Sequence, residues 1–139
     1  MDVAAGGSAA GKGTGLLLTG AAYAVLFLLG AAEGLIGSFH YSRAAPAAAI
    51  GFCVLLLATC LAGAWAMRSV TGALVPAAGW MLASFLLAMP VAAGSVIITN
   101  SAAGKWYLYG GSATAVAGVL LSFGLVSRRP GARPEARPR

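Results

Sequence analysis

The chain has 139 residues, of which 60% are hydrophobic and 9% are charged, whereas about 25% of the residues in an ordinary soluble domain are charged. Its formal net charge is +6. This composition excludes an ordinary soluble domain and predicts an integral membrane protein whose main partner is the lipid bilayer. We expect no nucleic acid among its partners.

Four apolar segments are long enough to cross a membrane, because a hydrocarbon core about 30 Å thick requires about 20 apolar residues per helix. In chain order they are 16–36, 47–67, 70–89 and 107–126. We therefore expect an all-α fold, an integral membrane four-helix bundle at 15–127. A flexible N-terminal tail is expected at 1–14 and a disordered, Arg- and Pro-rich cytoplasmic tail at 128–139.

The N-terminal tail contains the sequence GGSAAGKGT, which resembles the phosphate-binding loop of nucleoside monophosphate kinases. That loop requires a preceding strand and a following helix of a soluble domain. Here only five residues precede the motif and a predicted span follows it. We therefore interpret it as a tail with one Lys that helps to orient the chain, and no nucleotide cofactor is expected.

The first span carries Glu33, the one charged residue inside the predicted spans. Counted from the start of the span, it lies about 26 Å along the helix axis, near the outer edge of the hydrocarbon core. We expect it to converge on the outer membrane face with His40, Arg43 and Lys105. A structural role is the favoured interpretation, either as an ion pair with Lys105 or Arg43 or as a protonated acid bonded to a neighbour. A functional carboxylate is the alternative.

The second span contains Cys53 and Cys60, which are seven residues apart. On one helix they lie about 10 Å apart along the axis, beyond the roughly 7 Å Cα separation that a disulfide tolerates. We expect them not to bridge each other and to be small buried core residues, with lipidation or a disulfide to another chain as the alternative. A lone His40 predicts no metal site, and no nucleophile with a base is available. The sequence therefore predicts neither an enzyme nor a cofactor.

Aromatic and small residues suggest how the spans are placed and packed. Trp80 lies in the middle of the third span, where packing is expected. Small residues one helical turn apart let helix backbones approach closely, although such spacings arise by chance in a chain with 20 glycines. These small-residue pairs are Gly30 with Gly34, Gly79 with Ala83, and Gly118 with Ser122. The aromatic residues expected at the membrane interfaces are Tyr41, Trp65, Trp106, Tyr107 and Tyr109.

The distribution of Lys and Arg predicts the orientation. Seven of the nine basic residues fall in the two tails and the second loop, and the remaining two are Arg43 and Lys105. Because basic loops remain in the cytoplasm, we expect a multi-pass plasma-membrane protein with both termini cytoplasmic. The longer loop at 90–106 is then extracellular, and its SVIIT sequence favours a short hairpin or cap.

The C-terminal tail SRRPGARPEARPR is rich in Arg and Pro and poor in apolar residues. Its charges fix the topology in the favoured interpretation. The alternative is that the tail also binds anionic lipid head groups, at about 1 kcal/mol per basic residue near the surface.

The sequences EGLIGSF, MRSVTGALVPAAGW and ASFLLAMPVAAGSVIITNSAAGKWYLYGG resemble an uncharacterised family of small four-span membrane proteins from actinobacteria. The resemblance covers nearly all of residues 20–126. It implies the fold and the host but assigns no catalytic residues.

The sequence LLGAAEGLIGS is also similar to the first helix of small multidrug-resistance exporters, in which a membrane carboxylate exchanges protons for cationic drugs. That resemblance implies that Glu33 is the corresponding carboxylate, although the exporter carboxylates lie nearer the middle of the membrane. Our preferred hypothesis is a non-enzymatic accessory or scaffold protein that contacts a membrane-protein partner or a second copy of itself. A small proton-coupled transporter is the alternative.

Overall fold

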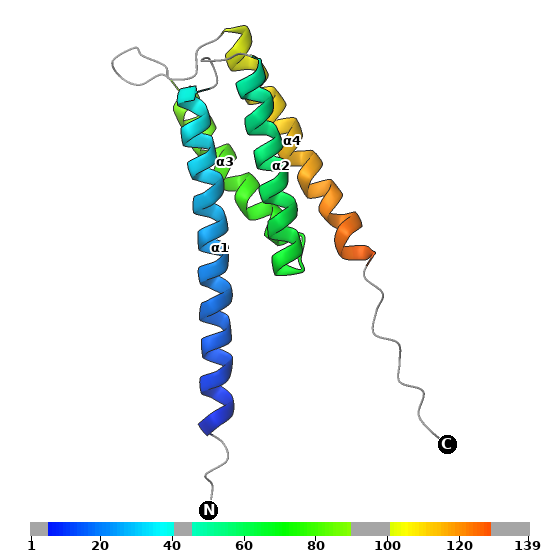
Figure 1. Ribbon diagram of the computed structural model, residues 1–139. Coiled ribbons are helices and arrows are strands. Elements are labelled where there is room, and N and C mark those ends of the chain that lie inside the picture. Colours follow the sequence, from blue (N-terminus) through cyan, green and yellow to red (C-terminus); the bar gives the residue numbers. More distant parts are fainter. Residues whose placement is uncertain (1–5, 41–45, 90–100, 129–139) are drawn as a thin grey trace, which may run out of the picture.

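The computed structural model describes residues 6–40, 46–89 and 101–128. Within these ranges it contains four helices and no strand, and each helix is long and apolar enough to cross a membrane. The predicted all-α architecture with four apolar helices is therefore confirmed (Figure 1). The helices are α1 (Gly6–His40), α2 (Ala47–Met67), α3 (Thr71–Ala88) and α4 (Ala102–Ser127).

Two helices begin earlier than the sequence predicted. α1 has 35 residues and starts at Gly6, inside the segment that was expected to be a tail. α4 starts before the predicted span because Ser101 caps it, accepting a hydrogen bond from the backbone N–H of Gly104 at 3.1 Å. Part of the predicted loop at 90–106 is therefore helical. The SVIIT segment, Tyr41 and Arg43 lie outside the described residues.

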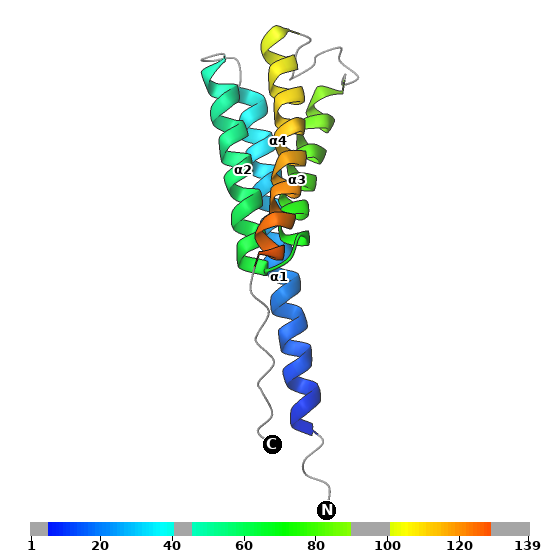
Figure 2. The same ribbon diagram turned by 90° about the vertical axis from the view of Figure 1, so that its right-hand side faces the viewer.

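The helices run up and down, so that successive helix ends alternate between the two ends of the bundle (Figures 1 and 2). The start of α1, the connection from α2 to α3 and the end of α4 share one end. At that connection Arg68 adopts a left-handed conformation with φ of 50° and closes α2. α1 is about 52 Å long against about 31 Å for α2, and it projects beyond the other helices at this end.

α1 and α3 pack closely through glycines. A Cβ atom added to Gly30 would overlap the backbone carbonyl of Pro76, and one added to Gly79 would overlap the carbonyl of Phe27. Gly34 packs against the backbone of α3 in the same way. The small-residue spacings of the first and third spans therefore lie at a true helix contact.

α2 contacts α3 and α4 through glycines as well. Gly63 and Gly72 face each other so closely that a Cβ on either would overlap the carbonyl of the other. The carbonyl of Gly72 has no helical N–H to accept from four residues later, because Pro76 lacks one. One turn away on α2, a Cβ on Gly118 of α4 would lie 2.9 Å from the Cβ of Cys60.

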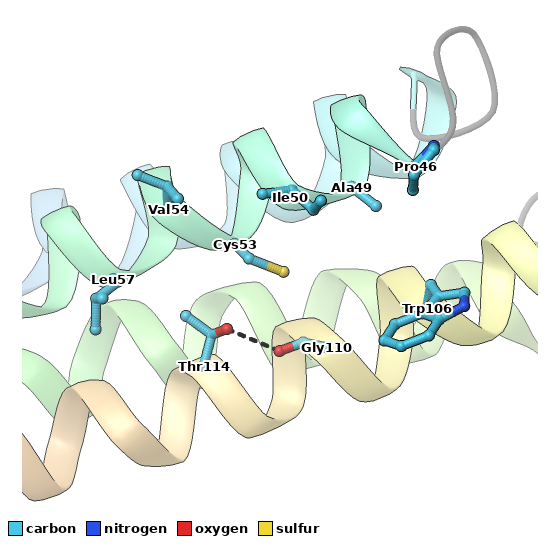
Figure 3. A pocket seen from close by; sticks show the side chains of 9 residues that line it. All are labelled: Pro46, Ala49, Ile50, Cys53, Val54, Leu57, Trp106, Gly110 and Thr114. Atoms are coloured by element: carbon cyan, nitrogen blue, oxygen red, sulfur yellow. Dashed lines mark hydrogen bonds between the residues drawn. The ribbon is translucent and has the colours of Figure 1, made fainter.

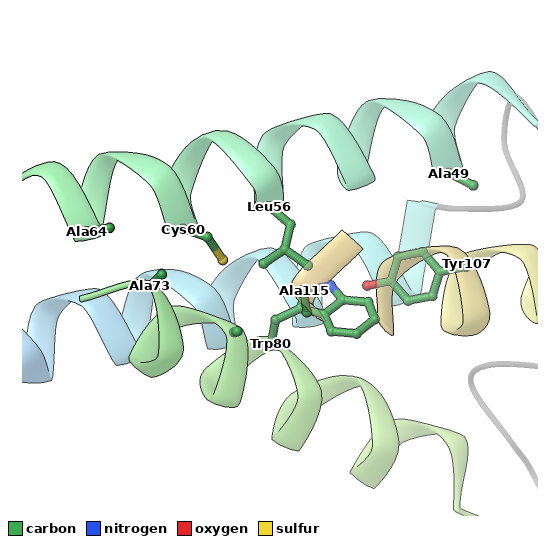
Figure 4. Packing of buried hydrophobic residues seen from close by; sticks show 9 residues of the cluster. Ala49, Leu56, Cys60, Ala64, Ala73, Trp80, Tyr107 and Ala115 are labelled. Carbon is green, nitrogen blue, oxygen red and sulfur yellow. The ribbon is translucent and has the colours of Figure 1, made fainter. Parts of the chain in front are cut away.

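Large aromatic residues fill the centre of the bundle, surrounded by alanines (Figure 4). Trp80 of α3 is 1% exposed, and its indole ring lies over Gly111, where a Cβ atom would overlap it. The Trp80 and Tyr107 rings are 5.6 Å apart between centroids. Trp80 is therefore a packing residue, as expected from its place in the middle of a span.

Candidate functional site

Glu33 lies inside the bundle, on the face of α1 that meets α2. Its side chain is 9% exposed, and the hydroxyl of Thr59 donates a hydrogen bond to its Oε1. Its Oε2 is buried and has no hydrogen-bond partner among the described residues. This contact between α1 and α2 is the Glu33–Thr59 pair.

The Glu33–Thr59 pair lies deeper than the sequence suggested. Thr59 is twelve positions after the first residue of α2 and eight before the last, or about 18 Å and 12 Å along the axis. Glu33 is therefore near the middle of the length of the bundle. Counting from residue 16 misplaced it, because the N-terminal part of α1 projects beyond the bundle.

The Glu33–Thr59 pair can hold the carboxyl group in either protonation state. The Thr59 hydroxyl is also 3.0 Å from the carbonyl of Leu55, and it has one proton to donate. When Glu33 is ionised, the Thr59 hydroxyl donates this proton to the carboxylate. A neutral Glu33 can instead donate to the Thr59 oxygen, leaving the Thr59 proton for the Leu55 carbonyl.

An apolar groove opens between α1 and α2 beside this pair. It has a volume of about 370 Å³, and Thr59 contributes the one polar side chain of its lining. We call it the α1–α2 groove. It is lined by Leu26, Leu29, Ala58, Thr59, Ala62, Gly63 and Ala66.

The structure describes three of the four residues of the predicted polar cluster, namely Glu33, His40 and Lys105. His40 is exposed at the end of α1, where its Nδ1 lies 3.0 Å from the carbonyl of Ile36. Lys105 is exposed in the first turn of α4, at the same end of the bundle. Glu33 lies two helical turns below His40, and among the described residues no ion pair joins it to Lys105. The cluster as a whole, which includes Arg43, stays a prediction.

A second polar contact, which the sequence did not predict, joins three helices. The Tyr107 hydroxyl of α4 donates to the carbonyl of Gly34 in α1 at 3.0 Å and lies 3.3 Å from the Ser84 hydroxyl of α3. Ser38 donates to the same carbonyl at 2.6 Å. The close approach is possible because Gly37 leaves room for the phenol ring. The sequence feature that could have predicted this contact is the group of small residues in GLIGS.

Tyr107 differs in its burial from the other aromatic residues that were predicted to lie at the membrane interface. It is 1% exposed and packs inside the bundle, because its ring is held by α1, α2 and α3 rather than facing outward. Trp65, Trp106 and Tyr109 are exposed near helix ends, Trp65 at one end of the bundle and the other two at the opposite end. Their place at the membrane interface stays a prediction.

The remaining candidates offer little chemistry. Cys53 and Cys60 are both free thiols, and Cys60 is buried. Among the described residues, no group of three His, Cys, Asp or Glu side chains could hold a metal ion.

No curated protein and no solved structure matches this chain. The sequence model of a family of unknown function, DUF6113, matches residues 11–137. The match includes most of α1 and all of α2, α3 and α4. The chain therefore belongs to this family of unknown function.

Proposed function

We propose that the protein is a non-enzymatic accessory or scaffold protein of the plasma membrane, which binds another membrane protein within the bilayer. The observation that carries this proposal is the uneven covering of the helices. None of the residues 13–29 of α1 is buried, whereas buried residues extend from Ala49 to Ala64 in α2, from Gly72 to Ser84 in α3 and from Gly104 to Ser122 in α4. α1 is thus attached to the bundle along one side and offers the rest of its surface to its surroundings.

Two parts of the surface remain for such a partner. The small-residue faces around Gly30, Gly34 and Gly79 are already used between α1 and α3. What remains is the projecting half of α1, with Leu17 and Leu18 exposed, and the α1–α2 groove. A transmembrane helix of a partner would bury apolar area along both.

The proposed orientation places both termini in the cytoplasm and the loop at 90–106 outside. It is supported by the seven of nine basic residues that share one side of the predicted topology. The basic tail would then face the anionic lipid head groups of the inner leaflet. The resemblance to proteins of actinobacteria makes the plasma membrane of such a bacterium the proposed location.

Quantitative copurification tests the proposal. The full chain is extracted in mild detergent from its native membrane, and the stoichiometry of bound proteins is measured by mass spectrometry. Ala62→Leu fills the α1–α2 groove, while Ala117→Leu makes the same change at an exposed position of α4 outside it. We expect a stoichiometric partner with the wild type and Ala117→Leu, and a reduced yield with Ala62→Leu. A wild-type chain that is monomeric and alone would contradict the proposal.

The second candidate function is proton-coupled export, and the position of Glu33 favours it. Ionisable residues inside a membrane often mark proton or ion pathways, and Glu33 lies near the middle of the bundle with one unpartnered oxygen. The accessory role is preferred because Thr59 holds the other oxygen, and the oxygen without a partner among the described residues is buried. Uptake of a lipophilic cation by liposomes, driven by a proton gradient and lost in Glu33→Gln, would reverse this preference.

A further inference from the structure

A second groove lies between α2 and α4, on a face of the bundle formed by neither α1 nor α3 (Figure 3). Its volume is about 520 Å³, larger than that of the α1–α2 groove. It runs from Pro46 and Trp106, near the starts of α2 and α4, down to Leu57 and Thr114. We call it the α2–α4 groove.

The α2–α4 groove is open because Gly110, which has no side chain, lies where α2 and α4 separate. At Gly118 an added Cβ would lie 2.9 Å from the Cβ of Cys60, so α2 and α4 are in tight contact there. Two turns earlier, at Gly110, only the Sγ of Cys53 lies within 4 Å of an added Cβ, at 3.5 Å. The helix surfaces therefore leave an open channel above their closest contact.

The lining of the groove fits a hydrocarbon chain. Ala49, Ile50, Val54 and Leu57 contribute apolar side chains. The one hydroxyl in the lining belongs to Thr114 and donates to the carbonyl of Gly110 at 2.8 Å, within its own helix. No hydroxyl donor is therefore left over for a polar ligand in the depth of the groove.

The mouth of the groove has a different character. Trp106 is 70% exposed there, and indole rings favour the level of lipid head groups. The next residue back, Lys105, is exposed in the first turn of α4, where the N-terminal end of the helix dipole adds partial positive charge. No acidic residue among the described residues lies at this end of the bundle. The positive charge at this end of the groove therefore complements the negative charge of a phosphate group.

We propose that the α2–α4 groove is a phospholipid site, in which one acyl chain lies between α2 and α4 and the phosphate lies beside Lys105 and Trp106. The chemistry that recognises the ligand is an apolar channel that begins at a basic, aromatic rim. A lipid with net negative charge binds more tightly than a zwitterionic one, because nothing at the rim offsets the Lys105 charge. This site is independent of the partner surface proposed for α1.

Photo-crosslinking tests the site on the full chain in detergent. The probes are phosphatidylglycerol and phosphatidylcholine with a photoactivatable group in the acyl chain, and crosslinked peptides are mapped by mass spectrometry. Crosslinks are expected on the α2 and α4 segments that line the groove. Gly110→Leu fills the channel, and its yield should fall about tenfold, as expected when several methylene contacts are lost. Gly124→Leu is the matched control, because a Cβ at Gly124 meets nothing within 4 Å.

Three further readouts test the site without relying on the Gly110→Leu variant. Gly110→Ala fills less of the channel and should give an intermediate yield. In the unmodified protein, added phosphatidylglycerol should slow the reaction of Cys53 with a small maleimide, with the buried Cys60 as internal reference. Lys105→Gln should remove the preference for phosphatidylglycerol over phosphatidylcholine while leaving acyl-chain crosslinks in place.

Three outcomes would overturn the site. One is an equal crosslinking yield in the wild type and a folded Gly110→Leu variant. Another is a set of crosslinks spread evenly over the lipid-facing surfaces of all four helices. The third is a disulfide between Cys53 residues of two chains under mild oxidation, which would show that a second copy occupies the groove instead of a lipid.

Discussion

The phenolic hydroxyl of Tyr107 donates a hydrogen bond to the backbone carbonyl of Gly34 at 3.0 Å, and this bond links α4 to α1 across the bundle. The backbones of these two helices are not adjacent. The ring of Tyr107 also packs against Phe52 of α2 and Trp80 of α3. One side chain thus contacts all three other helices, which makes it the central packing residue of the fold.

Tyr107→Phe should lower the stability of the bundle while keeping the ring in place. The loss is expected to be about 0.6–1.5 kcal/mol, because the Gly34 carbonyl retains its bond from Ser38. Thermal unfolding in detergent measures the change. Tyr109→Phe is the control, since Tyr109 is exposed on the same helix and its substitution should leave the midpoint unchanged. Equal midpoints for the two variants would contradict the role given to Tyr107.

The Glu33–Thr59 pair should behave as a coupled unit. Thr59→Val leaves a buried carboxyl without its donor and should cost about 1–3 kcal/mol. Glu33→Leu with Thr59→Val removes both polar groups and should be more stable than the sum of the single changes implies. Thr19→Val is the control, because Thr19 is exposed and bonds only within its own helix turn. Strict additivity in a double-mutant cycle would show that the pair does not interact.

The contact between α1 and α3 should not tolerate a methyl group. Gly79→Ala places a Cβ on the backbone carbonyl of Phe27, and backbone cannot move aside as a side-chain tip can. We expect this variant to lose several kcal/mol, at or beyond the upper end of the 1–3 kcal/mol typical of overpacking. Gly124→Ala meets nothing within 4 Å and should be neutral or stabilising by up to about 1 kcal/mol. Chemical denaturation in mixed micelles compares the two, and similar stabilities would refute the packing.

The orientation is tested by accessibility in intact cells. In a variant with Cys53→Ala and Cys60→Ala, a single Ser101→Cys should react with a membrane-impermeant thiol reagent. A single Ala132→Cys in the basic tail should react only after the cells are opened, because positive charge retains the tail inside. Labelling of the tail in intact cells would reverse the proposed topology.

The four helices were predictable because each requires only a long apolar run, and composition reports this directly. The depth and partner of Glu33 were not. Thr59 is 26 residues away from it in sequence, and α1 and α2 are each placed by glycine contacts with α3, whose pairing cannot be read from the sequence. The depth of Glu33 was counted from residue 16, which misplaced it because the N-terminal part of α1 projects beyond the bundle.

The aromatic residues illustrate the same limit. Tyr107 occurs in the run KWYLY, where its neighbours Trp106 and Tyr109 are exposed, and composition treats all of them alike. Its burial depends on Gly37 of α1, which leaves room for the phenol ring, while Gly111 leaves room for the neighbouring ring of Trp80. The small-residue spacings predicted which positions approach another helix but not which helix each one meets.

The central claim is that the uncovered surface of α1 binds a transmembrane partner. Site-specific photo-crosslinking in native membranes tests this most directly, with a photoreactive amino acid at Leu29 of α1, which lines the α1–α2 groove, or at Leu125 of α4. These side chains are similarly exposed, at 47% and 45%. The account predicts one protein adduct of defined mass from Leu29 and none from Leu125. Lipid adducts alone from both positions, or the same protein adduct from both, would contradict it.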